Sequence, residues 1–183
     1  MKISDYKKLN NDKELKKSNK KLRTVFNLFI RLRDLSVVRL PTSSAYNLTN
    51  STANPTENVY GRITGKCIAC GKTIEVELFQ DGSIMNGRSL HASHYFNTDK
   101  YPNVEFNEDN VHLSCARCNS PLGLHGNKEH YFPNLIKKIG KKRYEALVLA
   151  KTIKEPDILE IDRMCFEYKD KCRIEAKRLG IKI

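Results

Sequence analysis

Apolar residues recur at helical spacing near the N-terminus of the 183-residue chain. Leu22, Phe26 and Phe29 follow one another at intervals of four and three residues, which is the spacing of one face of an α-helix. The pattern predicts an amphipathic helix over about residues 13–36, whose apolar stripe docks on a core or on a second chain. Residues 5–20 are polar and rich in lysine, and we expect a disordered or weakly helical basic arm there.

The C-terminal third shows helical periodicity in three successive segments. The range Leu135–Gly140 predicts a helix that ends at its glycine, and Tyr144–Lys151 predicts a second short helix. A long helix is expected after Pro156, with an apolar seam that places Cys165 and Cys172 among its buried positions. We interpret these two thiols as small hydrophobic side chains rather than as ligands of a second metal. The seam consists of Ile158, Ile161, Cys165, Tyr168 and Cys172, at spacings of 3, 4, 3 and 4 residues.

Between these helical regions the pattern changes to that of strands and loops. Residues 41–58 are rich in Ser, Thr, Asn and Pro without periodicity, which indicates a loop or linker. Thr73–Gln80 alternates like a strand, and the following Asp81-Gly82 is a hairpin turn signal. We expect Ser89–Tyr95 to be the second strand of this hairpin, followed by a polar loop and a short helix. The chain is thus predicted to be an α+β protein.

The strongest chemical signal is a pair of C-x-x-C motifs separated by 44 residues. Each motif offers two thiolates from one tight turn, and four thiolates complete a tetrahedral zinc site. The chain shows no signal-peptide core and no run of about 18 apolar residues, so we expect a cytoplasmic protein without a membrane span. Thiols stay reduced in that compartment and are available to metals. We predict that Cys67, Cys70, Cys115 and Cys118 bind one structural Zn²⁺, in preference to being unligated core thiols.

The net charge of +12 is unevenly distributed. Residues 1–40 carry 12 basic and 4 acidic side chains, residues 41–127 carry 6 and 8, and residues 128–183 carry 15 and 9. The basic excess therefore lies on both flanks of a nearly neutral centre. Nucleic acid is the commonest polyanion bound by such flanks. The alternative is a charged surface that serves only solubility.

Polar residues of a recognisable order lie between and after the two cysteine motifs. His91-Ala-Ser-His94 ends the second predicted strand, Asn110 follows a loop, and Asn119 comes directly after the second motif. This layout resembles the ββα-metal, or HNH, nuclease motif. In that family a neutral imidazole takes a proton from the attacking water, and a divalent ion binds the scissile phosphate. The resemblance implies that His94 is the general base, Asn110 fixes the loop that carries it, and Asn119 is a metal ligand.

One position differs from the motif. Many of these nucleases place an Asp or His metal ligand directly before the base, where this chain has Ser93. On a strand His91 and Ser93 share a face, while His94 points to the other. His91 is therefore the first candidate for the missing ligand, and a member of the catalytic group, while His125 is the second candidate. The ion implied by the resemblance is Mg²⁺ or Mn²⁺, distinct from the structural Zn²⁺.

A wider resemblance links roughly residues 22–180 to the NinG (Rap) family of phage recombination endonucleases, which act on branched DNA such as Holliday junctions. It rests on Phe26–Asp34, His91–Tyr95, His125–Asn127 and Leu135–Gly140. It implies a DNA endonuclease in the cytoplasm of the host cell. The chain would divide into a basic arm and helix (1–40), a linker (41–58), a zinc-containing ββα-metal core (59–132) and a helical C-terminal region (133–183). The expected DNA contacts are Arg31, Arg33, Arg88, Arg117, Lys137, Lys138, Lys141 and Lys142.

Two other functions and one open question of assembly accompany this hypothesis. The chain could be a zinc-containing DNA-binding recombination protein without catalysis, which Ser93 in place of an acidic ligand favours, or an RNA-directed nuclease. Paired nicks in a junction need two active sites, so we expect a homodimer joined through Leu22–Phe29 and the Ile158–Cys172 seam. The same stripes could instead pack on each other within one chain.

Overall fold

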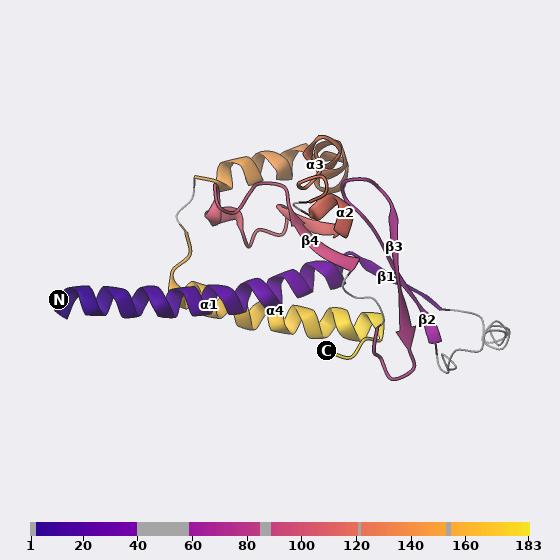
Figure 1. Ribbon diagram of the computed structural model, residues 1–183, viewed down its shortest axis with the longest axis horizontal. Helices are drawn as coiled ribbons and strands as arrows, with labels where there is room; N and C mark the ends of the chain where they lie inside the picture. Colours follow the sequence, from indigo (N-terminus) through magenta and orange to yellow (C-terminus); the bar gives the residue numbers. More distant parts are fainter. Residues whose placement is uncertain (1–2, 40–58, 85–88, 121, 153–154) are drawn as a thin grey trace.

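The structure is a computed structural model and consists of two long helices packed side by side, a three-stranded sheet at one end of them, and a unit of two strands and the remaining helices (Figure 1). The α+β class predicted from the sequence is confirmed. The predicted linker over residues 41–58 lies outside the described part of the chain. The described residues are 3–39, 59–84, 89–120, 122–152 and 155–183.

Helix α1 spans Ile3–Arg33, so it starts earlier and ends earlier than the sequence predicts. The lysine-rich residues 5–20 are helical throughout, because Lys is a good helix former even where no apolar stripe exists. The predicted end at residue 36 is wrong, since the chain turns at Asp34 and enters strand β1 (Leu35–Arg39). In Figure 1 the N-terminal part of α1 projects well beyond the rest of the molecule.

Helix α4 (Ile158–Leu179) lies side by side with α1 (Figure 1) and starts with a capping box. Its predicted apolar seam is buried except for Ile158, which is partly exposed, and the rings of Phe26 in α1 and Tyr168 in α4 meet edge-on with centroids 4.9 Å apart. The expectation that this seam joins two chains is therefore corrected. The two apolar stripes cover each other within one chain, which leaves Ile161 and Tyr168 only 1% and 5% exposed.

Strands β1, β2 (Val59–Lys66) and β3 (Thr73–Phe79) form an antiparallel sheet with β2 in the centre. Every second residue of β3 is buried, which is the alternation that the sequence predicts. At Gly65 this sheet approaches strand β5 so closely that an added Cβ would lie 2.3 Å from Cδ2 of Leu113. Glycine is favoured there, because any Cβ would force the side chains of Leu113 and Leu35 to move.

The predicted pairing of the histidine-bearing strand with Thr73–Gln80 is wrong. The turn at Gly82 forms, with a φ of 80°, but it leads only to an isolated bridge between Leu78 and Ile84. The histidine-bearing strand β4 (Leu90–His94) pairs instead with β5 (Val111–Cys115), antiparallel and in a separate two-stranded sheet. Periodicity identifies a strand but not its partner, because pairing depends on residues distant in sequence.

Two helices follow β5. Helix α2 (Ala116–Asn119) is short, as predicted. Helix α3 (Lys128–Ala150) is broken at Gly140, where φ is 79° and ψ is 160°. The sequence prediction of a helix with a glycine stop and a second helix over Tyr144–Lys151 is therefore confirmed.

One continuous hydrophobic core joins all these parts. Buried side chains of α1 and α4 contact buried residues of both sheets and of α3. Among the described helices, none combines the length and the apolar character that a membrane span requires. The core thus holds β4, β5 and α2, which carry the candidate site, in a fixed position against α1.

Candidate functional site

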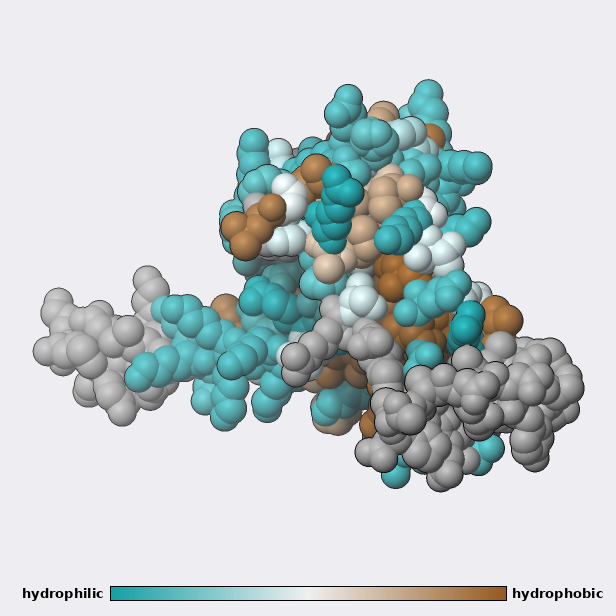
Figure 2. Space-filling view, turned by 45° about the vertical axis from the view of Figure 1, so that its right-hand side comes forward, coloured by the Kyte–Doolittle hydropathy of each residue, from teal (hydrophilic) through white to brown (hydrophobic). Residues whose placement is uncertain are grey.

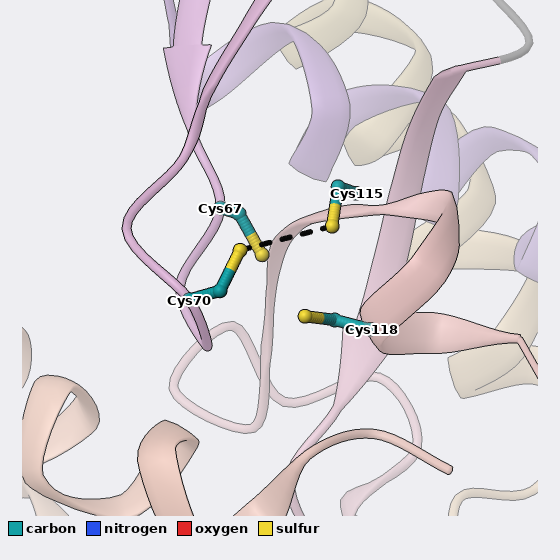
Figure 3. Close-up of side chains that lie close together, drawn as sticks. All are labelled: Cys67, Cys70, Cys115 and Cys118. Atoms are coloured by element: carbon teal, nitrogen blue, oxygen red, sulfur yellow. Dashed lines mark hydrogen bonds between the residues drawn. The ribbon is translucent and has the colours of Figure 1, made fainter. Parts of the chain in front are cut away.

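The four cysteines of the two C-x-x-C motifs converge on one point (Figure 3). Cys67 and Cys70 lie in the turn between β2 and β3, Cys115 ends β5, and Cys118 lies in α2. Their Sγ atoms all lie within 4.8 Å of one another, and the Sγ atoms of Cys70 and Cys115 are 3.9 Å apart. Four sulfurs at about 2.3 Å from a tetrahedral zinc lie about 3.8 Å from one another. The cluster therefore fits a structural Zn²⁺.

Backbone hydrogen bonds shape the first motif into a tight turn. The N–H of Gly71 donates to the carbonyl of Cys67, and the N–H of Cys67 donates to the carbonyl of Lys72, both at 2.9 Å. Gly71 has a φ of 71°, a conformation that glycine adopts without strain. The N–H of Ile68 donates to the carbonyl of Leu113 at 2.9 Å, which ties this turn to β5 and so to the second motif.

The thiols have different affinities for protons. Burial opposes ionisation of Cys67, but hydrogen bonds from the backbone of Cys70 and from the Ser114 hydroxyl outweigh it and lower the pKa of Cys67 to about 6. Burial raises the pKa of Cys118 to about 12. A coordinated divalent cation deprotonates its thiol ligands. The cluster is therefore suited to a cation, because four thiols at this distance do not ionise together without one.

The remaining two cysteines lie elsewhere. Cys165 and Cys172 are buried in the α1–α4 interface, and Sγ of Cys172 lies 3.4 Å from the carbonyl oxygen of Val25. Burial raises the pKa of Cys172 to about 11. The prediction that these thiols are buried in the apolar seam is confirmed.

His94, the candidate general base, lies at the end of β4 and is partly buried. Its Nε2 lies 3.1 Å from the backbone carbonyl oxygen of Glu105. A carbonyl oxygen only accepts hydrogen bonds, so Nε2 carries the proton and Nδ1 is the basic nitrogen. Burial lowers the pKa of His94 below its usual value, although the Glu105 carbonyl acts in the opposite direction. The imidazole is therefore neutral near pH 7.

Glu105 is itself fixed from α1. Its buried carboxylate accepts two hydrogen bonds from the guanidinium of Arg23, one from Nε and one from Nη2, the latter at 3.1 Å. The residue directly follows a short 3₁₀ helix, Pro102–Val104. The carbonyl that orients His94 therefore belongs to a residue anchored to α1 by its side chain. Sequence reasoning missed both Glu105 and Arg23, since no motif marks a backbone carbonyl.

Asn110 is completely buried and holds both ends of the loop between β4 and β5. Its Oδ1 accepts a hydrogen bond from the N–H of Phe96 at 2.7 Å, and its Nδ2 donates to the carbonyl of Phe96 at 3.2 Å. Nδ2 also donates to the carbonyl of Val104 at 2.9 Å. Through Phe96 and Val104 one side chain thus connects the segment after His94 with the segment before Glu105. This geometry supports the structural role that the sequence suggests for Asn110.

His91 and Asn119, the first two candidate ligands of a catalytic ion, lie side by side. Nδ2 of Asn119 is 3.3 Å from Nδ1 of His91. Ser93 is only 1% exposed, and its Oγ has no hydrogen-bond partner among the described residues. The hydroxyl of the buried Tyr131 donates a hydrogen bond to the Ser93 carbonyl at 2.9 Å. Ser93 therefore offers no ligand at the surface, whereas His91 does.

The other two histidines of interest differ in their surroundings. His125 is exposed in the turn after α2, at a φ of 47°. No hydrogen bond in the described part of the chain joins it to His91 or Asn119. His112 is buried between the Arg33 guanidinium, 2.9 Å from its Nδ1, and the carbonyl of Asp109. The structure thus brings His91 and Asn119 together.

Two of the expected DNA contacts are occupied within the fold. Arg33 donates to Asp34 and to the carbonyls of Glu108 and Val111, so few of its N–H groups remain for phosphate. Nζ of Lys138 lies 2.8 Å from Oδ2 of Asp34. Asp34 is an anchor that sequence reasoning missed, although an acidic residue between Leu32 and Leu35 is a possible signal.

The remaining expected DNA contacts differ in accessibility. Arg31 is partly buried; burial lowers its pKa, and its Nε donates to the carbonyl of Asn27 at 3.1 Å. Arg88 lies outside the described residues. Hydrophilic residues cover most of the coloured surface of α1 and of the upper body in Figure 2. Besides Lys138, which is exposed but paired with Asp34, the exposed members of the expected set are Arg117, Lys137, Lys141 and Lys142.

Comparison with known proteins gives a family match. A family model described as "Bacteriophage Lambda NinG protein" matches residues 58–178, which is more than half of the 183-residue chain. The matched range contains all four cysteines of the cluster and the candidate residues His91, His94, Asn110 and Asn119. No curated protein and no solved structure matches the chain.

Proposed function

Because the chain belongs to the NinG family, we propose that it is a metal-dependent endonuclease that cleaves branched DNA formed in recombination. The catalytic unit is β4–β5–α2, which has the order of a ββα-metal, or HNH-like, nuclease core. His94 is the general base, and the four cysteines hold a structural Zn²⁺ apart from the chemistry. Both roles rest on the family resemblance and on the contacts of the described residues.

The observation that carries the proposal is the contact between Nε2 of His94 and the carbonyl oxygen of Glu105. Hydrolysis of a phosphodiester needs a base that is unprotonated near neutral pH and held in one tautomer. The Glu105 carbonyl keeps the proton on Nε2, so Nδ1 is free to accept a proton from water. Burial, which lowers the pKa of His94, keeps Nδ1 unprotonated. The buried His112 shares both features, through the Asp109 carbonyl and through its own burial, but His94 is only partly buried and stands where the family resemblance places the base.

His91 and Asn119 fit a partial set of ligands for Mg²⁺ or Mn²⁺. Such an ion, when bound, stabilises negative charge on the phosphate and on the leaving oxygen. His91 offers an imidazole nitrogen, and the adjacent Asn119 offers an amide oxygen once its amide group is turned over. Mg²⁺ is commonly held by only one or two protein ligands, with phosphate oxygens and water in the remaining positions.

The zinc site supports this unit mechanically. It joins the β2–β3 turn to the end of β5 and to α2, which carries Asn119. Since α2 has only four residues, it is too short to be stable by itself. The cysteine cluster therefore fixes Asn119 relative to β4.

The charge distribution supports DNA as the substrate. The basic excess of residues 1–40 and 128–183 flanks the nearly neutral centre that holds the candidate base. Exposed lysines of α3 and the arginine of α2 lie on the elements that surround β4. Such a surface binds phosphates independently of sequence, which suits recognition of branched structure.

The test is a cleavage panel of linear, flap, three-way and four-way DNA with added Mg²⁺ or Mn²⁺. We expect nicks in branched DNA from the native chain and none from His94→Ala. His130→Ala is the matched control, because His130 is an exposed histidine at the start of α3. Binding without nicks in either ion would favour a non-catalytic DNA-binding protein. Stronger cleavage of RNA substrates in the same panel would favour an RNA-directed nuclease.

A further inference from the structure

Five aromatic rings gather beside the candidate base on the loop after β4 and on helix α3. They come from segments far apart in sequence and contact one another through an unbroken series of ring pairs. The function proposed above assigns no role to these rings. We call it the aromatic cluster, and its members are Tyr95, Phe96, Tyr101, Phe132 and Tyr144.

The rings are arranged in both stacked and edge-on pairs. Tyr95 and Phe132 are nearly parallel, with centroids 6.1 Å apart and an interplanar angle of 26°. Phe96 and Tyr144 are also nearly parallel, at 6.4 Å and 27°. Phe132 meets Tyr144 edge-on at 5.4 Å. The contacts connect the β4–β5 loop with both halves of the broken helix α3, so the cluster is well ordered.

Exposure distinguishes this cluster from an ordinary part of the core. Tyr131 is 0% exposed and belongs to the hydrophobic core, whereas the adjacent Phe132 is 42% exposed. The other four members are partly exposed as well. Packing alone favours burial of aromatic rings, since each buries a large apolar area. Rings that stay open to solvent are available to a partner with a flat aromatic surface.

Positive charge borders the cluster. Nζ of Lys151 lies 4.5 Å from the ring centroid of Phe96 and 4.8 Å from that of Tyr101. Nζ of Lys100 lies 5.6 Å from the Tyr101 centroid. Neither lysine forms an ion pair within the part of the chain that the structure describes. Aromatic faces bordered by lysines are the combination with which proteins hold unpaired bases and the phosphates beside them.

The cluster is rigidly linked to the candidate active site. Tyr95 and Phe96 directly follow His94, and Asn110 fixes both the N–H and the carbonyl of Phe96. The same Asn110 side chain also binds the carbonyl of Val104, next to the residue that orients His94. A base that stacks on the cluster would therefore be held at a fixed position relative to His94.

We propose that the aromatic cluster stacks with an unpaired base of the DNA at or near the branch point. The inference rests on the proposed function and names the feature of the substrate that the site recognises. In a linear duplex the faces of the bases are covered by their neighbours, so the cluster finds no partner there. At a branch point bases are unstacked more easily, and one base can lie on the rings while Lys151 contacts an adjacent phosphate. The cluster thus selects branched over linear DNA.

The experiment measures binding without cleavage, in buffer without added Mg²⁺ or Mn²⁺ and without chelators, which would remove zinc. The DNA is a four-way junction with 2-aminopurine at the branch point, and a linear duplex of the same length. We expect the native chain to quench the 2-aminopurine signal. Phe132→Ala and Phe132→Leu should each weaken junction binding about tenfold and leave duplex binding nearly unchanged. Phe132→Trp should retain the preference, because it keeps a flat ring.

Phe166→Ala is the matched control. Phe166 is also exposed, at 69%, and has Lys169 over its ring at 5.4 Å, but it lies on α4. This control should bind both DNAs like the native chain. The Leu variant keeps the apolar packing of Phe132, so a loss in this variant is not a folding defect, and an unchanged melting temperature verifies this.

Three results would overturn the inference: equal weakening of junction and duplex by Phe132→Leu, no weakening of either, or an equal effect of Phe166→Ala. A native chain that binds no DNA would also overturn it and would point to a protein partner for the rings. The outcome is separable from the proposed function. Selective binding that depends on Phe132, without any cleavage, would refute the nuclease and keep the aromatic cluster. Cleavage that prefers branched DNA equally with and without the Phe132 ring would support the nuclease and refute the role of the aromatic cluster.

Discussion

Asp34 is the buried anion that connects α1 to the candidate site, and its neutralisation should destabilise the protein strongly. The carboxylate is 8% exposed. It accepts hydrogen bonds from Nε of Arg33 at 3.0 Å and from the N–H of Leu113 at 2.9 Å, and Nζ of Lys138 lies 2.8 Å from it. These contacts join the end of α1 to β5 and to α3. The substitution Asp34→Asn keeps the size of the side chain and removes its charge.

The expected loss of unfolding free energy follows from the two cations, Arg33 and Lys138, that Asp34→Asn leaves without their anion. Removal of one partner from a buried, hydrogen-bonded charge pair costs about 3–5 kcal/mol. Arg33 keeps its bonds to two backbone carbonyls, and Lys138 is 40% exposed and can turn to water. We therefore expect a loss near the lower limit, about 3 kcal/mol of the free energy of unfolding. In a domain with a total stability of about 5–15 kcal/mol this is a large fraction.

The assay is urea unfolding at neutral pH, followed by circular dichroism. Asp170→Asn is the control, since Asp170 forms an exposed pair with Arg173 on α4 and should lose at most about 1 kcal/mol. If Asp34→Asn loses less than the control, the reasoning about Asp34 is refuted.

A pH titration of the native chain gives an independent check on Asp34. Burial opposes ionisation of Asp34, but the neighbouring His112, Arg33 and Lys138 outweigh it and hold the pKa of Asp34 well below its usual range. A carboxyl group with a lowered pKa stabilises the folded state above its unfolded pKa of about 3.9. This stability is lost as the pH falls below that value. Asp34→Asn should therefore flatten the acid limb of the stability curve.

Three further results are expected. The rate of DNA cleavage should rise with pH, and the midpoint of this rise should lie below the usual histidine pKa of about 6.5, because burial lowers the pKa of His94 and the base works unprotonated. A rate that rises only above pH 8 would exclude His94 as the base. Purified protein should contain about one zinc per chain by metal analysis, and Cys118→Ser should lower both the zinc content and the melting temperature. Gly65→Ala should cost about 1–3 kcal/mol in urea unfolding, because its Cβ would meet Leu113 and Leu35; an unchanged midpoint would show that the sheets can separate.

Local features of the fold could be predicted from the sequence. The apolar seam of α4, the glycine break at Gly140 and the alternation of β3 follow from periodicities of 3.6 and 2 residues, which are properties of the backbone itself. The convergence of the cysteines could also be predicted, because two C-x-x-C turns in one chain commonly share a metal. The order of His94, Asn110 and Asn119 suggested the chemistry through a family resemblance.

Contacts between distant segments were decided only by the tertiary structure. Periodicity marked the strand that ends in His94, but its partner β5 lies beyond a loop whose path the buried Asn110 side chain fixes through Phe96 and Val104. The partner of the α4 seam was open between α1 and a second chain, since an apolar stripe does not specify what covers it. The carbonyl of Glu105 could not be foreseen at all. Every residue has a carbonyl, and only the path of the backbone determines which one meets His94.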